Sequence, residues 1–481
     1  MVPESGAEGG RRHIGTAPPQ WVIDGAGGFG IEFLQGCRSS SQEKSVVLRS
    51  SRAQGVQKFA ACLFLALAIL PAALAASGFT PQQRVGYRTG DQWEPALATD
   101  GHGHIYVMFP QYGAVGDCPA CVAPTMALLV SDDNGISWEP PRALVASSLG
   151  QFDAQIKVDP VDRQTLYASW LQGKHDIMVA RSQDFGRSWY LAVAEHSAEV
   201  VIDKPVLAVR GPNVYVSFNH DQTLAIAASH DYAQNFSSAV VNPDAGPGWS
   251  LAAGATVDPA SNVYFSWTAY PRTNVLTRPV EVFVSRSSDG GRNWSTVSMD
   301  VSSAGPGCPA QVCSAGFLAS QMALVSDDAG VIYALWNSGS LPGGPERIYF
   351  SSSTNQGESW SAKVDISKAP SGVEHCFPAI TAGTAGDVRI AWMDTREVDA
   401  QNHPLWNTFY RASTNGGATW SPESQLSGPV RGYDYIRPNG FLFPFGNLFS
   451  IAIDNLGDTH VAWGEGRNYR SPGSIWYARG R

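Results

Sequence analysis

Carboxylate, guanidinium and phenol side chains recur near the ends of apolar segments in the last quarter of the chain. Glu374, Asp394 and Glu465 could act as acid, base or nucleophile in glycoside hydrolysis, which uses a pair of carboxyl groups. The side chains that could hold an acidic sugar beside them are Arg396, Arg437, Arg467, Tyr435 and His375. We therefore predict a carbohydrate site with three catalytic carboxylates and five substrate-binding residues.

A wider set of polar residues occupies comparable positions earlier in the chain and around this region. Glu94, Asp153, Asp203 and Lys204 precede or begin apolar segments, whereas His175, His220 and Glu397 follow them. The residues at such positions could form a ligand site, but they could equally be solvated or paired with each other. Which of these side chains lie close together depends on how the strands that they flank are arranged.

An eight-residue pattern, Ser-x-Asp/Asn-x-Gly-x-Ser/Thr/Asn-Trp, occurs six times, here called the octets. The copies span residues 131–138, 182–189, 229–236, 287–294, 353–360 and 413–420. The Asp or Asn can accept hydrogen bonds from turn amides, the Gly can adopt a left-handed conformation, and the Trp can cover the hairpin. In the third copy Ala233 replaces Gly and Phe236 replaces Trp, so we expect a strained or rebuilt turn and the loosest hairpin.

A second repeat alternates with the octets and occurs seven times. Each copy is an apolar segment, a turn rich in Asp, Pro, Gly and Asn, and a segment with an aromatic end: 96–109, 156–170, 207–218, 255–267, 323–336, 379–392 and 451–463. Together the two repeats predict four-stranded antiparallel blades and an all-β, seven-bladed β-propeller, with six blades and a stray hairpin as the alternative. No octet follows the seventh copy, so we expect the N-terminal segment Gln83–Tyr87 to complete the last blade and close the ring.

Blade geometry divides the connections between two faces. The octets lie on one face, the octet face, and the connections before the first and after the second strand of each blade lie on the other, the loop face. The longest insertions, 110–124, 301–320 and 427–447, belong to the loop face, as do the candidate residues named above. Function commonly resides in such loops on a rigid scaffold.

The composition and the N-terminal region indicate an exported protein. The 481 residues have a formal charge of −9, and no basic cluster in the repeat region suggests nucleic-acid binding. Residues 56–76 have a basic start, an apolar stretch broken by Pro71 and an Ala-x-Ala end, which predicts a signal peptide, with a membrane span as the alternative. We expect residues 1–55 to be a disordered or untranslated leader, residues 77–481 to be the propeller, and the protein to be secreted or periplasmic.

Five cysteines follow the predicted signal peptide. Local disulfides 118/121 and 308/313, with Cys376 left over, suit an exported protein. The alternatives are a redox dithiol at Cys118-Pro-Ala-Cys121 and a metal site built from these cysteines and His375. We expect no metal and no other cofactor.

The octets resemble the Asp-box, or BNR, repeat of the sialidase superfamily over nearly all of the chain after residue 77. The resemblance implies a propeller whose active site has an arginine triad, a Tyr–Glu nucleophile pair and an Asp acid. The family's Arg-Ile-Pro-Ala element corresponds here to Cys376-Phe377-Pro378-Ala379, in which cysteine replaces the arginine. The family's following strand end corresponds to Ala391-Trp392-Met393-Asp394-Thr395-Arg396, and a second copy occurs at residues 462–467.

Two functions fit these observations. The first is an exported, sialidase-like glycoside hydrolase that acts on an acidic sugar or glycan at the loop face. The second is a non-catalytic propeller that binds a glycan or a protein there. The replaced arginine favours binding, whereas the grouped acids and arginines favour chemistry. The expected partner is a glycan or cell-surface polymer, with no nucleic acid, no membrane span after processing, and a monomeric state.

Overall fold

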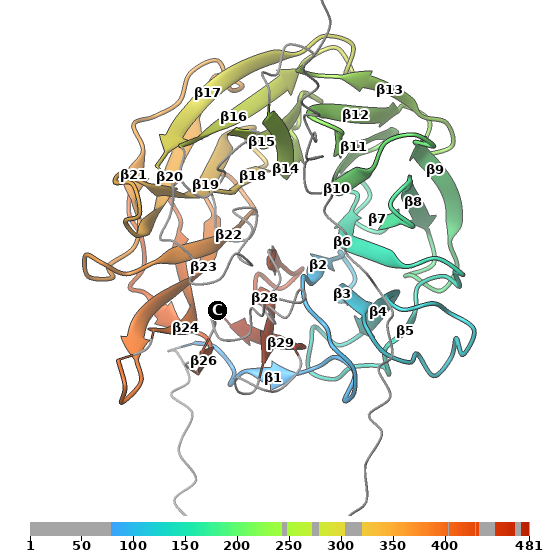
Figure 1. Ribbon diagram of the computed structural model, residues 1–481, viewed down its shortest axis with the longest axis horizontal. Coiled ribbons are helices and arrows are strands. Elements are labelled where there is room, and N and C mark those ends of the chain that lie inside the picture. The colour runs from blue at the N-terminus through green and yellow to red at the C-terminus, as the bar shows by residue number, and fades with distance from the viewer. Residues whose placement is uncertain are drawn as a thin grey trace, which may run out of the picture. The chain divides into compact units, whose positions relative to one another are not determined.

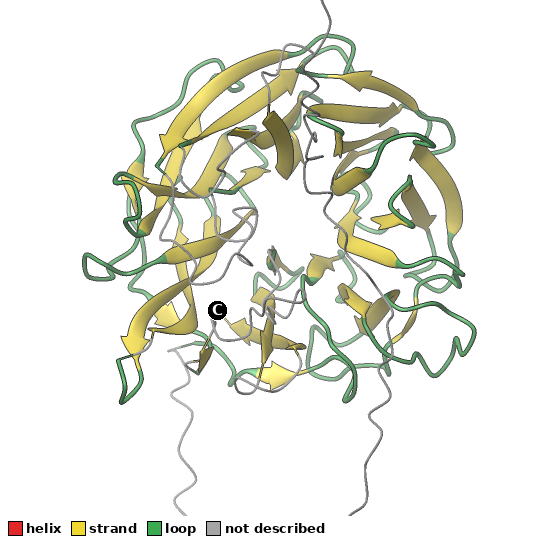
Figure 2. Cartoon of the chain, in the orientation of Figure 1, coloured by secondary structure: helices red, strands yellow, loops and turns green. Residues whose placement is uncertain are grey.

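The computed structural model describes residues 78–242, 248–271, 279–303, 320–402, 404–428, 430–431, 448–466 and 473–480, all within the compact unit Pro71–Arg481. These residues form strands, turns and irregular segments without helices, as Figure 2 shows. The all-β prediction is confirmed.

The strands form seven antiparallel sheets arranged as a ring of blades (Figure 1). Blade 1 contains β2 (Ala96–Thr99), β3 (Ile105–Gln111), β4 (Thr125–Ser131) and β5 (Arg142–Ala143). Blade 2 contains β6 (Gln151–Val158), β7 (Leu166–Gln172), β8 (Asp176–Ser182) and β9 (Tyr190–His196). Blade 3 contains β10 (Ile202–Arg210), β11 (Asn213–His220), β12 (Thr223–Ser229) and β13 (Ser237–Val240).

The second half of the ring repeats this order. Blade 4 contains β14 (Gly248–Val257), β15 (Val263–Pro271), β16 (Val280–Ser287) and β17 (Ser295–Ser302). Blade 5 contains β18 (Met322–Ser326), β19 (Ile332–Gly339), β20 (Glu346–Ser353) and β21 (Val364–Asp365). Blade 6 contains β22 (His375–Ala382), β23 (Val388–Val398), β24 (Pro404–Ser413) and β25 (Ser424–Gln425), and β26 (Val430–Arg431) also pairs with β24.

Blade 7 joins the two ends of the described chain. Its strands β27 (Ser450–Ile453), β28 (Thr459–Gly466) and β29 (Gly473–Gly480) are completed by β1 (Gln83–Arg84). Strand β1 pairs with β29 in the register Gln83↔Tyr477, and the first strand of each blade contacts the first strand of the next, β27 and β2 included. Seven blades and closure by an N-terminal strand are confirmed, and the six-bladed alternative is wrong.

The octets form the predicted turns between the third and fourth strands. In the second copy, the Asp184 carboxylate accepts hydrogen bonds from the Ser188 hydroxyl at 2.6 Å and the Ser188 amide at 2.9 Å. The Ser182 hydroxyl accepts a bond from the Gly186 amide, and Gly186 has φ +77°. These hydrogen bonds, that of the Ser188 side chain first, lower the pKa of Asp184 to about 2. The turn thus holds an ionised carboxylate at its centre.

The third octet is strained but not rebuilt. Ala233 adopts φ +62°, and its amide still donates to the Ser229 hydroxyl at 3.0 Å. The Asp231 carboxylate still accepts bonds from the Asn235 amide and side chain. The Ala233 methyl group lies in the apolar cluster between blades 2 and 3. The chain therefore tolerates the left-handed alanine within an otherwise unchanged turn.

Seven apolar clusters, one at each junction between neighbouring blades, form the core of the ring. The terminal aromatic of each octet packs against the cluster shared with the preceding blade, and the edge of Trp138, for example, meets Tyr477 of blade 7 with ring centroids 4.9 Å apart. These aromatics do not simply cover their own hairpins, as the octet pattern suggested. Because large aromatic side chains contribute strongly when buried, the octets fasten each blade to its neighbour.

Exchanging glycine and alanine in two octet turns should have unequal effects on stability. Gly186→Ala should lower the free energy of unfolding by about 1–2 kcal/mol. The alanine backbone would be held at φ +77°, and its Cβ would lie 3.2 Å from Leu128 Cδ2. Ala233→Gly should change it by less than about 1 kcal/mol, because relief of strain is offset by loss of a buried methyl group. Urea unfolding of both variants would test this; a larger loss for Ala233→Gly than for Gly186→Ala would contradict it.

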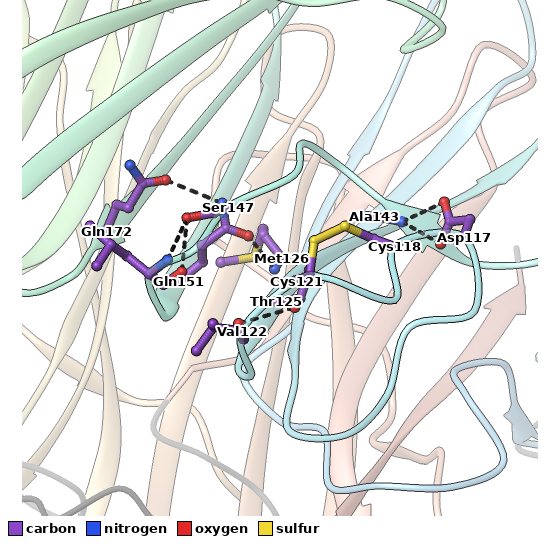
Figure 3. The surroundings of a disulfide bond; sticks show 11 residues. Asp117, Cys118, Cys121, Val122, Thr125, Met126, Ala143, Ser147, Gln151 and Gln172 are labelled. Carbon is purple, nitrogen blue, oxygen red and sulfur yellow. Dashed lines mark hydrogen bonds between the residues drawn. A yellow bond between two sulfur atoms is a disulfide. The ribbon is translucent and has the colours of Figure 1, made fainter.

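The disulfide predicted between Cys118 and Cys121 is present, with its two Cα atoms 5.4 Å apart. It closes a short turn in the connection from β3 to β4 on the loop face (Figure 3). The adjacent Asp117 carboxylate accepts a bond from the Ala143 amide of β5, and the Val122 amide donates to the Ser147 carbonyl. The loop is therefore attached to the outer part of its own blade. Cys308 and Cys313 lie outside the described residues.

Candidate functional site

Three of the predicted site residues in blade 6 lie together. The β22–β23 register pairs His375 with Asp394, whose side chains approach to 3.7 Å. The Asp394 carboxylate accepts hydrogen bonds from Arg396 Nη2 at 2.6 Å and from Trp392 Nε1 at 3.0 Å. Its side chain has 0% exposed surface. Arg396 also donates to Glu423 at 2.6 Å, so its guanidinium already joins two carboxylates.

His375 is enclosed by backbone groups. Its Nδ1 lies 3.0 Å from the Glu346 carbonyl and 2.9 Å from the Val373 carbonyl, and Nε2 lies 2.7 Å from the Ser367 hydroxyl. Burial lowers the pKa of His375 to about 4, with the Asp394 charge opposing this shift. A neutral imidazole whose Nδ1 donates and whose Nε2 accepts satisfies all of these contacts.

Glu374 forms a buried acid pair with a residue that the sequence did not indicate. The Glu374 carboxylate accepts a hydrogen bond from the Glu346 amide at 2.9 Å, and both side chains are buried. Burial raises the pKa of Glu346 to about 8, while burial and then the Glu346 charge raise that of Glu374 well above its ordinary value. Burial therefore disfavours the charged form of both carboxyl groups.

Glu465 lies on β28 in blade 7, one blade away from the other predicted carboxylates. Its carboxylate accepts a hydrogen bond from Trp463 Nε1 at 2.9 Å, and 3% of the residue is exposed. Burial raises its pKa to about 8, with opposing bonds from Trp463 and Gln82. Tyr435, Arg437 and Arg467 lie outside the described residues, so the roles predicted for them stay predictions.

Glu465→Gln should flatten the dependence of stability on pH. Folding raises the pKa of this carboxyl from its ordinary value to about 8. The contribution of the group to the stability of the folded protein is therefore fully present at a pH below its pKa in the unfolded chain, and it is lost as the pH rises toward 8. Between pH 5 and 8 the free energy of unfolding of the variant should therefore gain roughly 3 kcal/mol relative to the wild type. Urea unfolding at several pH values measures this; the exposed control Glu139→Gln should show no such gain, and a constant difference for Glu465→Gln would contradict the burial argument.

A second group of charged residues is held by unusual backbone at the inner strands of blades 1 to 3. Extra residues interrupt the register after Phe152 in β6 and after Asp203 in β10, and these β-bulges begin with Asp153 at φ +58° and Lys204 at φ +52°. Glu94, which precedes β2, has φ +52°. Left-handed backbone at non-glycine residues is costly and accumulates at functional sites.

These residues meet at one point on the loop face. Lys204 Nζ lies 2.5 Å from the Asp153 carboxylate and 3.6 Å from that of Glu94. The Lys204 amide donates to the side chain of Asp203 at 2.9 Å, and Asp203 shares a side-chain hydrogen bond with Asp153. We call Glu94, Asp153, Asp203 and Lys204 the charged cluster. It joins three consecutive blades through four side chains.

The charged cluster contains groups with well-separated proton affinities. Burial, followed by the negative charge of Asp153, raises the pKa of Asp203 to about 7, although Lys204 opposes this shift. Burial alone would lower the pKa of Lys204, but the carboxylates around it, that of Asp153 first, raise it. Asp203 is thus a proton donor near neutral pH beside a fixed ammonium–carboxylate pair.

Asp153 and Lys204 of the charged cluster border a small depression of about 10 Å³, which is about the room that one water molecule needs. Asp153 and Lys204 form one wall, whereas Leu251 and neighbouring alanines of β14 form the opposite apolar wall. Gln321 and Leu448, which precede β18 and β27, complete the lining. A sugar ring would have to lie across this depression rather than inside it, because pockets that enclose such ligands are far larger.

The described residues contain no group of three or more His, Cys, Asp and Glu side chains arranged to hold a metal ion. In the same ranges, no helix is long and apolar enough to cross a bilayer. Cys376 is a buried free thiol, and burial raises its pKa well above the ordinary value, so it is poorly suited to act as a nucleophile.

Sequence reasoning placed the four residues of the charged cluster on the loop face but did not select them. A signal was present: Glu94, Lys204 and Phe377 each precede a proline that leads into an inner strand. Phe377, at φ +55°, begins the corresponding bulge in blade 6. Aligning the strand starts of the repeats would have shown that polar residues occupy this strained position in blades 1 to 3.

No protein-family model matches the chain, and no curated protein matches it by sequence. Solved structures do. An ulvan lyase from a new family of polysaccharide lyases is 13% identical with a TM-score of 0.46, and the match covers 82% of this chain and 95% of the lyase. The intramolecular trans-sialidase from Ruminococcus gnavus is 12% identical with a TM-score of 0.42, covering 85% and 98%.

A protein of unknown function from Dyadobacter fermentans is also similar, with 12% identity, a TM-score of 0.46 and coverage of 84% of this chain and 98% of its own. The chain is similar in fold to the sialidases across most of its length. The resemblance indicated by the octets agrees with the seven blades of the structure, which show the propeller fold. At such low identity it assigns neither a reaction nor a substrate.

Proposed function

We propose that this protein is an exported glycoside hydrolase whose reaction takes place at the charged cluster on the loop face. The observation that supports this proposal is the pairing of Asp153 and Glu94 with the Lys204 ammonium, next to Asp203, which accepts a hydrogen bond from the Lys204 amide. Asp203 gives its proton to the departing glycosidic oxygen as the bond from that oxygen to the anomeric carbon breaks. A water molecule adds to the anomeric carbon and gives a proton to the Asp153 carboxylate, and exchange with solvent restores both carboxyl groups. The Asp153 and Glu94 carboxylates, oriented by Lys204, stabilise the positive charge that develops on the sugar ring.

The Asp153 and Glu94 oxygens both contact Lys204 Nζ, at 2.5 and 3.6 Å, so they lie no more than about 6 Å apart. The Asp153 and Glu94 carboxylates are therefore close enough to act on the same sugar residue. The acidic sugar predicted from the sequence depends on Arg396, which is engaged with Asp394 and Glu423, and on arginines outside the described residues. The substrates tested should therefore include both neutral and acidic sugars.

A panel of fluorogenic glycosides, with neutral, amino, uronic acid and sialic acid sugars, tests the proposal. Wild-type protein should hydrolyse at least one, and Asp203→Asn should abolish that activity. Glu374→Gln, Asp394→Asn and Glu465→Gln should retain most of it. The reverse pattern would support the site in blades 6 and 7 predicted from the sequence and overturn the one proposed here.

Non-catalytic glycan binding is the second candidate function. It is favoured by the contacts of Asp394, whose oxygens both accept hydrogen bonds within the protein, and by the replacement of the family's arginine by Cys376. Wild-type protein that binds immobilised glycans but hydrolyses no glycoside of the panel would support this candidate.

A further inference from the structure

Strand β9, at the outer edge of blade 2, presents an exposed apolar segment. It is the last strand of its sheet and lies on the rim of the ring (Figure 1). Tyr190, Leu191 and Val193 are 48%, 44% and 51% exposed. Together with Ala192 they form an uncharged run of four residues before the bulge at Ala194. Backbone groups along such an edge can pair with another strand.

The other outer strands are short or protected. Strands β1, β5, β21 and β25 have two residues each, and β13 has four. Strand β17 is as long as β9, but its carboxylate at Asp300 bonds to Lys363 Nζ at 2.7 Å and Trp336 Nε1 at 2.9 Å. These bonds tie the β17 edge to blade 5, and charge on an edge strand discourages pairing.

Opposite charges flank the two ends of β9. Arg181, which pairs with Tyr190 in the register and lies 5.5 Å from its ring centroid, and the exposed Arg187 lie at the beginning. Glu195 and the exposed Glu199 lie at the end. Antiparallel pairing of two β9 strands would place the cationic end of each against the acidic end of the other. The edge is therefore complementary to itself in charge.

We propose that two copies of this chain associate through antiparallel edge-to-edge pairing of β9, related by a two-fold axis near Ala192. The pairing extends the sheet of blade 2 into the sheet of its partner and covers Tyr190, Leu191 and Val193 of both copies. The loop faces stay accessible, because β9 lies at the rim and the charged cluster lies at the inner strands (Figure 1). This inference is independent of the proposed function.

Sedimentation equilibrium of the wild-type chain up to about 200 µM tests the pairing. The wild type should be a reversible dimer. Val193→Lys should weaken the dimer at least about tenfold, because each new ammonium group would lie against Leu191 of the second copy and the two like charges would be diagonal neighbours across the strand pair. The control Val301→Lys replaces a valine that is 58% exposed on β17, and it should leave the dimer unchanged.

Exchanging the signs of two charged residues near the ends of β9 distinguishes specific pairing of β9 from nonspecific association. Arg187→Glu and Glu195→Arg should each weaken the dimer by about threefold or more, and the double variant, in which both signs are exchanged, should recover most of the affinity. Thermal unfolding confirms that the variants remain folded. A monomeric wild type at the highest concentration, or equal weakening by Val193→Lys and Val301→Lys, would overturn the proposal.

Discussion

Asp203→Asn is expected to lower kcat by about 10²–10⁴-fold on any glycoside that the wild type hydrolyses. The amide cannot donate a proton to the leaving oxygen, yet its oxygen can still accept the hydrogen bond from the Lys204 amide. Substrate binding should change little, so the loss should appear in kcat rather than in KM. Steady-state kinetics of the two proteins measures both quantities.

The pH profile distinguishes a proton donor from a structural carboxylate. Because the pKa of Asp203 is raised to about 7, wild-type kcat/KM should fall as the pH rises above 7 and the donor loses its proton. Glu139→Gln, a change on the octet face, should retain wild-type kinetics. An Asp203→Asn variant with more than half of the wild-type kcat would rule out its assignment as the acid.

Lys204→Met is expected to lower the free energy of unfolding by about 3 kcal/mol. The change removes the ammonium from between Asp153 and Glu94, whose side chains are each only 6% exposed, and leaves two carboxylates close together with little solvation. Chemical denaturation at pH 7 measures the loss. Lowering the pH should reduce it, because protonation of the carboxylates relieves the repulsion.

Lys363→Met provides a matched comparison. Lys363 also contacts an aspartate, at 2.7 Å, but its side chain is 41% exposed, so its removal should cost less than about 1 kcal/mol. Equal losses for the two variants would show that Lys204 contributes no more than an ordinary surface ion pair.

The repeats in the sequence were sufficient to predict the blades. Octet turns such as 182–189 depend on hydrogen bonds over four residues, and the paired apolar segments depend on short hairpins, so each motif specifies its own local structure. The absence of a seventh octet and the position of Gln83 predicted the closing strand, which pairs with Tyr477 as expected. The local disulfide between Cys118 and Cys121 followed from spacing in the same way.

The repeats did not indicate which of the loop-face residues lie close together. Sequence similarity directed attention to Asp394 and Arg396, which the structure shows bonded to each other, with the Asp394 side chain fully buried. Lys204 meets Asp153 and Glu94 only because the bulges in β10 and β6 redirect their side chains, and no periodicity marks such a bulge.

The sequence by itself therefore determined the strands, their turns, the number of blades and the closure of the ring, because each depends on contacts between residues close in the chain or repeated along it. Only the tertiary structure decided which charges share a site and which are enclosed. Those properties depend on side-chain directions and solvent exclusion among residues about 50 to 110 positions apart, as from Glu94 to Lys204, and these arise when neighbouring blades pack.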